Sequence, residues 1–291
     1  AGGIKESDFL EGNDRGRIYR IVPKDFKADK KKMPQLSKMD INGLVGVLNN
    51  PNMWWRMNAQ RLLVDRKDAA AVPLIKDLVS KDISPEGTMN VLWTLEGLGA
   101  LSDSLMEKAF LDASPLVRKQ AVLLTESRLG NKNIFDRVIN AYSDPDPFVQ
   151  FQVALTLSNA TKSNPQVFQA LNHIISTHIN DEWFQTAVLL GAAENAIQWY
   201  EAFKDFEVKV DSQKVGKREF LRKISSIVGA KYNGNEMSSL VKMISAIKDT
   251  GVVVSSLQGM VDGMMRNTNK IKLTAAGQHG LMSLISYKSP S

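Results

Sequence analysis

The 291-residue sequence contains no cysteine and only three histidines. The absence of cysteine excludes thiolate nucleophiles, thiolate metal sites, disulfides and haem attachment through a C-x-x-C-H motif within these residues. Of the histidines, His173 and His178 lie about 140° apart on a helix, so they do not form the i, i+4 pair of an H-E-x-x-H zinc site. His279 stands alone between Gln278 and Gly280. We therefore expect neither a metal site nor a cofactor in this chain.

Long apolar runs are also missing. No stretch reaches eighteen consecutive apolar residues, so we expect no membrane insertion. The N-terminal residues lack the basic and then apolar pattern of a signal sequence. Apolar residues make up 43% of the chain and charged residues 23%, which is the composition of a folded protein rather than a disordered one.

The net charge of +6 is unevenly distributed along the chain. It is +3 over residues 1–40, −4 over 41–203 and +7 over 204–291, where 14 basic residues stand against 7 acidic ones. A basic region can meet nucleic acid, an acidic protein or an anionic surface. A solvated basic helical face is the commoner cause of such a pattern.

Residues 1–39 differ from the rest of the chain. Residues 16–22 alternate polar and apolar side chains and end at Pro23, which predicts a single β-strand. One strand cannot form a sheet, so its partner strand lies elsewhere or is missing from this chain. The lysine-rich residues 24–38, which include Lys30, Lys31 and Lys32, predict a linker. We assign residues 1–39 to an extended segment, which would be the remnant of a preceding β-domain.

From Asp40 onwards apolar residues recur with helical spacing, and the pattern itself repeats. Asp40 is a predicted N-cap, and four prolines that follow a capping residue predict further helix starts. These prolines, Pro51, Pro85, Pro115 and Pro147, are 34, 30 and 32 residues apart. A fixed period of this length is typical of a helical array.

Each repeat also contains a second apolar helix, predicted at residues 71–79, 105–111, 134–141 and 167–179. Two helices joined by a few polar residues form a hairpin that buries its apolar stripes only by stacking on neighbouring hairpins. Small side chains at the centre of each first helix would allow close approach: Ala59, Ala121, Ala154 and Ala187. We predict repeats over residues 40–203 and a divergent helical C-terminal region over 204–291 that caps the array.

The start D/S-P-x-V-R followed by an Ala-rich apolar helix resembles the HEAT repeat family over about residues 41–200. This resemblance implies an all-α fold, a right-handed α-α superhelix (a HEAT-like, armadillo-like solenoid). In that family an Arg at the fourth position pairs with acidic residues of adjoining repeats. Arg56 and Arg118 hold this position, but Gln150 and Gln185 replace it later, so we do not expect a continuous charge ladder.

A more specific resemblance covers roughly residues 13–130. The strings G-R-I-Y-R-I from Gly16, W-W-R from Trp54 and L-W-T-L-E-G-L from Leu92 resemble bacterial membrane-bound-dehydrogenase-like proteins. Those exported proteins carry a sugar-dehydrogenase β-propeller, then HEAT repeats, and often a cytochrome c domain. The resemblance implies that G-R-I-Y-R-I is the closing propeller strand and that the protein is periplasmic or extracellular. Neither the propeller nor a haem motif is present in this chain.

Carboxylates show no paired arrangement of the kind that acid–base catalysis needs. Asp144 and Asp146 flank Pro145 and are predicted to be turn and N-cap residues. Glu96 lies on an apolar helix, where it would be either a perturbed acid or base or the ion-pair partner of an Arg in the adjoining repeat. We favour structural ion pairing, with Arg56 or Arg118 as the partner of Glu96.

The candidate binding surface consists of Trp54, Trp55, Arg56 and Trp93. Tryptophans at matching places of successive repeats can line one surface, and such aromatic rows bind partners. The alternative is that at least two of the three fill the interior, and we expect at most one of them to be exposed. Trp54 and Trp55 are adjacent and point about 100° apart on a helix.

The sequence favours a non-catalytic protein-interaction or inter-domain scaffold module over two alternatives. Its partners would be another protein or the neighbouring domains of the same polypeptide. The first alternative is nucleic-acid binding by the basic C-terminal region and the lysine-rich linker. It requires that a set of basic residues share one concave face with further Lys or Arg: Lys214, Lys217, Arg218, Arg222 and Lys223. The second is an enzyme with a cleft at the C-terminal helices, for which no catalytic residues are identified.

Overall fold

The computed structural model describes residues 21–27, 34–160, 164–208, 210–231, 233–266, 274–275, 277–279 and 282. The chain divides into two compact units, Ala1–Lys38 and Met39–Ser291. The described residues are helical and contain no strand, which agrees with the predicted all-α class.

Little of the first unit is described. Ile21 and Val22, the last two residues of the predicted strand, are not in a strand and are exposed to solvent. The rest of that strand and the lysines of residues 30–32 lie outside the described residues. The region predicted as a linker ends in a short 3-10 helix, η2 (Leu36–Lys38).

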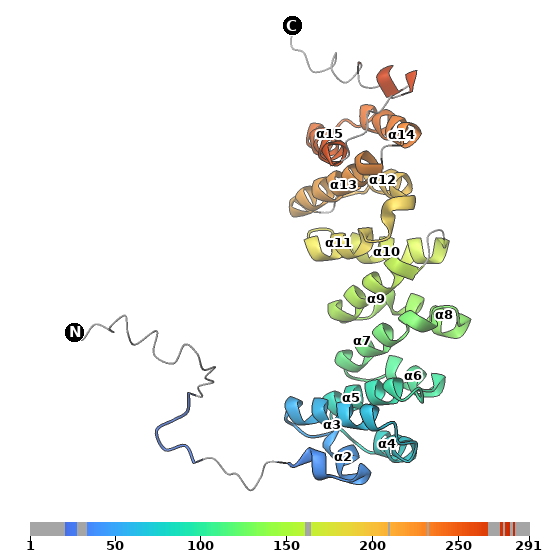
Figure 1. The fold of residues 1–291 in the computed structure, drawn as a ribbon. Coiled ribbons are helices and arrows are strands. Elements are labelled where there is room, and N and C mark those ends of the chain that lie inside the picture. Colours follow the sequence, from blue (N-terminus) through green and yellow to red (C-terminus); the bar gives the residue numbers. More distant parts are fainter. Residues whose placement is uncertain are drawn as a thin grey trace, which may run out of the picture. The chain divides into compact units, whose positions relative to one another are not determined.

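In the second unit the helices form two columns (Figure 1). The first column consists of α3 (Met53–Arg66), α5 (Pro85–Gly97), α7 (Pro115–Leu124), α9 (Pro147–Ala160), α11 (Glu182–Leu189), α13 (Asp211–Lys231) and α15 (Thr250–Met265). The second consists of α2 (Ile41–Val47), α4 (Ala71–Val79), α6 (Asp103–Phe110), α8 (Lys132–Asn140), α10 (Pro165–Thr177), α12 (Ala196–Lys204) and α14 (Gly234–Ser245). Short 3-10 helices follow some of them: η3 (Glu126–Arg128), η4 (Ala141–Ser143) and η5 (Ala192–Glu194).

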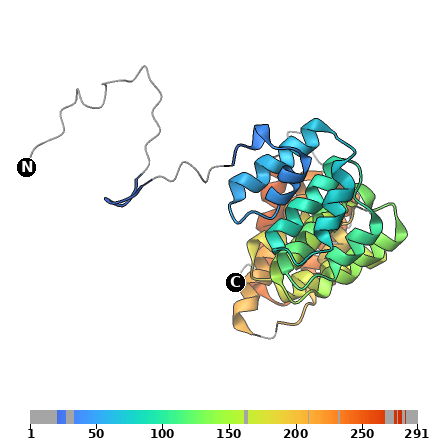
Figure 2. The same ribbon diagram turned by 90° about the horizontal axis from the view of Figure 1, so that it is seen from below.

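Each first-column helix contacts the next one along the chain, from α3 through α15. In the second column α2 contacts α4, α6 contacts α8, α8 contacts α10, and α12 contacts α14. Seen from below, the helices of this unit overlap along the line of sight (Figure 2). Successive helix pairs are therefore stacked on one another. The alternation of helices between the two columns continues beyond residue 204, through α13, α14 and α15.

The helix starts follow the predicted capping chemistry with two differences. The carboxylate of Asp40 accepts a hydrogen bond from the Gly43 N–H, and Ser84 caps α5 in the same way. The sequence predicts a helix start at Pro51, but α3 begins at Met53, because Asn52 is the N-cap and its side chain accepts from the Trp54 N–H. Ser114 precedes Pro115 as predicted, but its side chain makes no capping hydrogen bond.

The core lies between the two columns and between successive pairs. On α9, Val149, Val153 and Leu157 recur at i, i+4 and i+8 and are fully buried, so this stripe faces the interior. The central alanines that we expected to permit close approach are buried in all four first helices: Ala59, Ala121, Ala154 and Ala187. Burial of these small side chains is consistent with close stacking.

The C-terminal helices pack most closely. α13 and α15 meet at glycines of both helices, since a Cβ on Gly259 would lie 2.1 Å from the Arg222 carbonyl oxygen, and one on Gly263 2.1 Å from that of Ser226. The C-terminal region predicted to be helical, residues 204–291, contains α13, α14 and α15. Most of residues 273–287 lie outside the described residues.

Candidate functional site

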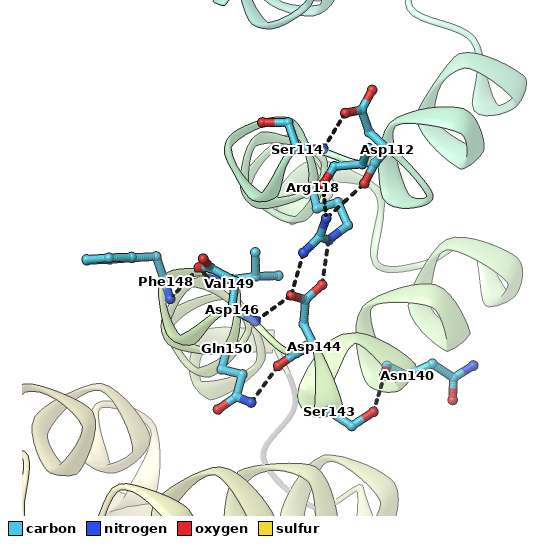
Figure 3. Close-up of polar contacts among 11 residues, drawn as sticks. Asp112, Ser114, Arg118, Asn140, Ser143, Asp144, Asp146, Phe148, Val149 and Gln150 are labelled. Atoms are coloured by element: carbon cyan, nitrogen blue, oxygen red, sulfur yellow. Dashed lines mark hydrogen bonds and ion pairs between the residues drawn. The ribbon is translucent and has the colours of Figure 1, made fainter. Parts of the chain in front are cut away.

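At the fourth position of α3, α7, α9 and α11, an Arg or Gln side chain binds the turn before its own helix and reaches a neighbouring turn or helix. Arg118 of α7 forms a two-bond ion pair with Asp144, with Nε–Oδ2 and Nη2–Oδ1 distances of 2.7 and 2.9 Å (Figure 3). Its Nη1 also donates to the carbonyl oxygens of Asp112 and Ala113, in its own inter-helix turn. Arg118 thus holds the turn before α7 and reaches the turn before α9.

The electrostatics of this ion pair favour the charged forms. Burial by itself would raise the pKa of Asp144, but hydrogen bonds from Arg118 and from the Asp146 N–H outweigh it and lower that pKa. The hydrogen bond to Asp144 raises the pKa of Arg118. Only 15% of the Arg118 side chain and 9% of the Asp144 side chain are exposed, so the pair is largely shielded from water.

The glutamines at the same position make equivalent contacts. Gln150 donates from Nε2 to the Asp144 carbonyl oxygen, six residues earlier, at 2.6 Å, and its Oε1 lies 2.6 Å from Nε2 of His178. Gln185 donates to the Ile179 carbonyl oxygen, also six residues earlier, and to that of Gly216 on α13. At Gln150 and Gln185 the ladder loses its charge, as expected, but the hydrogen bonds that it makes remain.

Arg56 belongs to this interior ladder and not to a binding surface. Its side chain is only 6% exposed, and it donates to the Asn50 and Pro51 carbonyl oxygens and to Oδ1 of Asn90. Within the described residues its partners are neutral oxygens, so the predicted ion pairing of Arg56 is wrong. Because the guanidinium is buried and bonded to this turn and to Asn90, it does not form part of an exposed surface.

Glu96 is paired with an arginine of the adjoining repeat, as predicted, but the partner differs. Both oxygens of Glu96 accept hydrogen bonds from Arg128, which lies in η3 after α7. Arg118 is occupied by Asp144, and Arg56 is buried beside Asn90. This pairing favours the structural role of Glu96 over an acid–base role.

The side of the first-column helices that points away from the core is mostly apolar. In α3, α5, α7, α9 and α11, the second, fifth and ninth residues counted from the helix start share one helical face and are exposed or half-buried in every case. In α11 the ninth residue, Leu190, is the C-cap. We call these fifteen residues the open face: Trp54, Met57, Arg61, Glu86, Met89, Trp93, Leu116, Lys119, Leu123, Phe148, Phe151, Leu155, Trp183, Thr186 and Leu190. Eleven are apolar, whereas the solvent side of a helix is normally polar.

Exposed apolar side chains distinguish the two columns. Trp54, Phe148 and Trp183 of the first column are 65%, 69% and 68% exposed. Among the described residues, no large apolar side chain within α2, α4, α6, α8, α10, α12 or α14 is exposed. On the side of the second column, Leu111 is an exposed large apolar residue, but it lies directly after α6 rather than within the helix. Among the described residues, exposed large apolar side chains within the helices of the two columns are therefore confined to the first column.

The predicted aromatic residues divide between surface and interior. Trp54 is exposed, whereas Trp55 is half-buried and Trp93 is half-buried with its Nε1 donating to Gln120. The expectation that at most one of the three is exposed is therefore confirmed. Trp93 still borders an open groove of about 380 Å³ between α3 and α5, which Met57 and Arg61 also line.

Phe148, Trp183 and Leu190 are not among the residues that the sequence singled out. In Figure 3 the ring of Phe148 points away from the Arg118–Asp144 pair and from α7. Phe148 and Trp183 hold the second position of their helices, as Trp54 does in α3. This shared position is visible when the repeats are aligned and would have identified both.

The basic residues of the nucleic-acid alternative are mostly engaged. Four have partners: Lys214 pairs with Asp211, Lys217 donates to the Phe206 carbonyl oxygen, Arg218 pairs with Asp249, and Arg222 pairs with Asp262. Burial lowers the pKa of Lys217. Lys223 has no partner within the described residues. These residues do not form a continuous free cationic face.

Groups suited to catalysis or metal binding are sparse. In the described part of the chain, no cluster of three or more His, Asp or Glu side chains is arranged to hold a metal ion. A cavity of about 520 Å³ beside α10 and α12 has Glu194 as its only titratable lining residue in the described ranges. His173 packs edge-on against Tyr142, and His279 is exposed.

No protein-family model matches this chain, and none of the curated proteins matches it. Over the described residues, no helix combines the length and apolar character needed to cross a membrane.

Proposed function

We propose that this chain is a non-catalytic protein-interaction or inter-domain scaffold module that binds its partner through the open face. The observation that carries this proposal is the one-sided exposure of large apolar side chains. Leaving Trp54, Phe148 and Trp183 in water has no stabilising effect on the fold, since each is about two thirds exposed. Burial against a partner would remove this apolar area from water.

The fold that we propose is a right-handed α-α superhelix of the HEAT type. The stacked pairs, the repeated helix starts and the ladder of Arg118, Gln150 and Gln185 support it. An array of this kind gains stiffness and area from contacts between neighbouring repeats rather than from one central core. Such a surface suits a spacer that holds other domains at fixed positions.

The proposed setting comes from the resemblance in the sequence. In the dehydrogenase-like proteins a helical segment lies between a β-propeller and, often, a cytochrome c domain. We propose that this chain has the same place in an exported protein and holds those domains in relation to each other. The module itself would contain no cofactor, and its location would be periplasmic or extracellular.

A pull-down from the native organism tests the proposal. The bait is this chain, compared with a variant in which Trp54, Phe148 and Trp183 are all changed to Ser. A matched control is Leu111→Ser, because Leu111 is 72% exposed but lies on the second column. Circular dichroism and thermal unfolding first establish that all three proteins are equally folded.

We expect a propeller-containing or cytochrome-containing protein to bind the unchanged chain and the Leu111→Ser control, and to be lost with the triple variant. Equal recovery by all three baits would contradict the role of the open face. Recovery of nucleic acid with affinity that falls steeply with salt would favour the nucleic-acid alternative.

A further inference from the structure

A second groove lies on the first column between α11 and α13, with a volume of about 580 Å³. Its apolar lining comes from Leu189, Leu190 and Ala193 on one side and from Ile227 and Ala230 on the other. Leu190 belongs to the open face and is more than half exposed. The groove therefore continues the apolar surface of the preceding repeats toward the C-terminal helices.

The charged residues that line this groove are all basic. They are Lys223 and Lys231 of α13 and Arg266, the C-cap of α15, and no acidic residue lines it within the described ranges. Lys231 pairs with Glu236. Lys223 and Arg266 have no partner among the described residues.

Helix-end electrostatics account for some of these cations but not for all. Lys231 and Arg266 lie at the C-terminal ends of α13 and α15, where positive charge interacts favourably with the helix dipole. Lys223 lies eight residues before the end of α13, beyond the reach of this effect. Helix-end electrostatics therefore do not account for Lys223.

We infer that this groove binds an amphipathic protein segment whose apolar side chains are flanked by carboxylates. This inference rests on the proposed function and specifies its partner. Lys223 and Lys231 are separated by about 12 Å along the helix axis, at 1.5 Å per residue. A carboxylate opposite Lys223, with a second one about eight residues further along a helix that follows α13 or about four along an extended segment, would reach Lys223 and the end of the groove lined by Lys231 and Arg266.

The spacing favours a peptide over a lipid or fatty acid. Lys231 already has Glu236 as its counter-charge, so Lys223 and Arg266 are the groove cations without one among the described residues. Lys223 lies about one turn before Ser226, and Arg266 about one turn after Gly263, which packs on Ser226, so a single anionic head group at Lys223 would leave Arg266 without a counter-charge. The groove is also open along its length and continuous with the open face at Leu190. A peptide segment with apolar anchors and separated carboxylates satisfies both features.

Photo-crosslinking in the native cells tests this inference. The crosslinking amino acid benzoylphenylalanine replaces Leu190 in the groove, Phe148 elsewhere on the open face, or Lys242 on α14 as the control, and mass spectrometry identifies the crosslinked segments. A synthetic peptide of the segment captured at Leu190 is then titrated against the unchanged chain, Lys223→Glu and the control Lys242→Glu. A second peptide carries Lys in place of its carboxylates.

We expect an acidic amphipathic segment at Leu190 and none at Lys242. Lys223→Glu should weaken binding of the acidic peptide by about tenfold and strengthen binding of the Lys-substituted peptide, while Lys242→Glu changes neither. Crosslinks to lipid, to nucleic acid or to a basic segment would overturn the inference, as would an unchanged affinity in Lys223→Glu. Crosslinks at Phe148 without any at Leu190 would overturn it and leave the proposed function standing, whereas crosslinks at neither position contradict both.

Discussion

Gln150 of α9 and His178, the C-cap of α10, connect α9 to the turn before α11 through one short hydrogen bond, with 2.6 Å between Oε1 and Nε2. Because Gln150 donates from Nε2 to the Asp144 carbonyl oxygen, its Oε1 is the atom that faces His178. Oε1 only accepts, so a neutral His178 carries its proton on Nε2. The ring of His178 also stacks on Phe184 of α11 at a centroid distance of 3.9 Å.

This junction predicts a loss of stability in mildly acidic solution. Burial lowers the pKa of His178, although Asp181 partly opposes the effect, so the unfolded chain takes up the proton first. The free energy of unfolding should be constant well above pH 6.5, fall as the pH drops through 6.5, and level off below the folded-state pKa. Urea unfolding at several pH values between 8 and 5 measures this, with His178→Gln as the comparison.

The His178→Gln variant should show a smaller loss over this range. Equal pH dependence in both proteins would contradict the assignment of the effect to His178.

Breaking the Arg118–Asp144 pair should be strongly destabilising. Arg118→Ala leaves the carboxylate of Asp144 shielded without its counter-charge, and we expect a loss of about 3 kcal/mol. The exposed pair Lys132–Asp136 is the control, since Lys132→Ala should cost no more than about 0.5 kcal/mol. If chemical denaturation gave similar losses in the free energy of unfolding for the two variants, the stabilising role assigned to the Arg118–Asp144 pair would be refuted.

The same pair contributes to acid denaturation. The pKa of Asp144 is lowered in the folded state, so its contribution is complete above its ordinary value of 3.8 and is lost as the pH falls through the folded-state value. Asp144→Asn should therefore unfold at neutral pH more readily than the unchanged chain and show a shallower further loss below pH 4. If the free energy of unfolding fell equally steeply below pH 4 in both proteins, this contribution of Asp144 would be disproved.

Glycine at the contact of α13 and α15 is required for close approach. In Gly263→Ala the new Cβ would collide with the Ser226 carbonyl oxygen, so the helices must separate, at a cost of about 1–3 kcal/mol. A Cβ added at Gly46 of α2 would meet no atom within 4 Å, so Gly46→Ala should stabilise by about 0.5–1 kcal/mol. Thermal unfolding measures both, and the two shifts should have opposite signs.

The buried hydrogen bond between Tyr200 and Ser256 joins α12 to α15 at 2.8 Å. Tyr200→Phe should cost about 1–2 kcal/mol, because Ser256 is left without its donor in the interior. Burial raises the pKa of Tyr200 to about 12, so stability should fall as the pH rises above 10, where the unfolded tyrosine ionises first. A Tyr200→Phe variant with the same alkaline loss as the unchanged chain would contradict this.

Helix starts are largely predictable because the capping side chain and its helix are adjacent in sequence. Asp40, Ser84 and Asp181 cap as their neighbours in the sequence suggest. Pro51 is misleading because Asn50 and Asn52 both offer capping oxygens, and the carboxamide of Asn50 binds the Asn52 N–H instead. That choice depends on Arg56, which holds the carbonyl oxygens of this turn.

Contacts between repeats are harder to predict, because they depend on the turn geometry. The partner of Glu96 is Arg128, since η3 directs the chain back toward α5 after α7. The glutamines of the ladder were expected to interrupt it, yet an amide reaches the same carbonyl oxygen six residues earlier as the guanidinium does. The close contact of α13 and α15 joins residues more than 30 positions apart, so their glycines gave no signal.

Side-chain footprinting of the native assembly tests the open face most directly. Hydroxyl radicals label accessible side chains, and the labelling of Trp54, Phe148 and Trp183 is compared between the isolated chain and the assembly, with Leu111 as the internal control. We expect the three aromatic side chains to be protected in the assembly while Leu111 is labelled equally in both. Equal labelling of all four, or protection of Leu111 alone, would contradict the assignment of the binding surface to the first column.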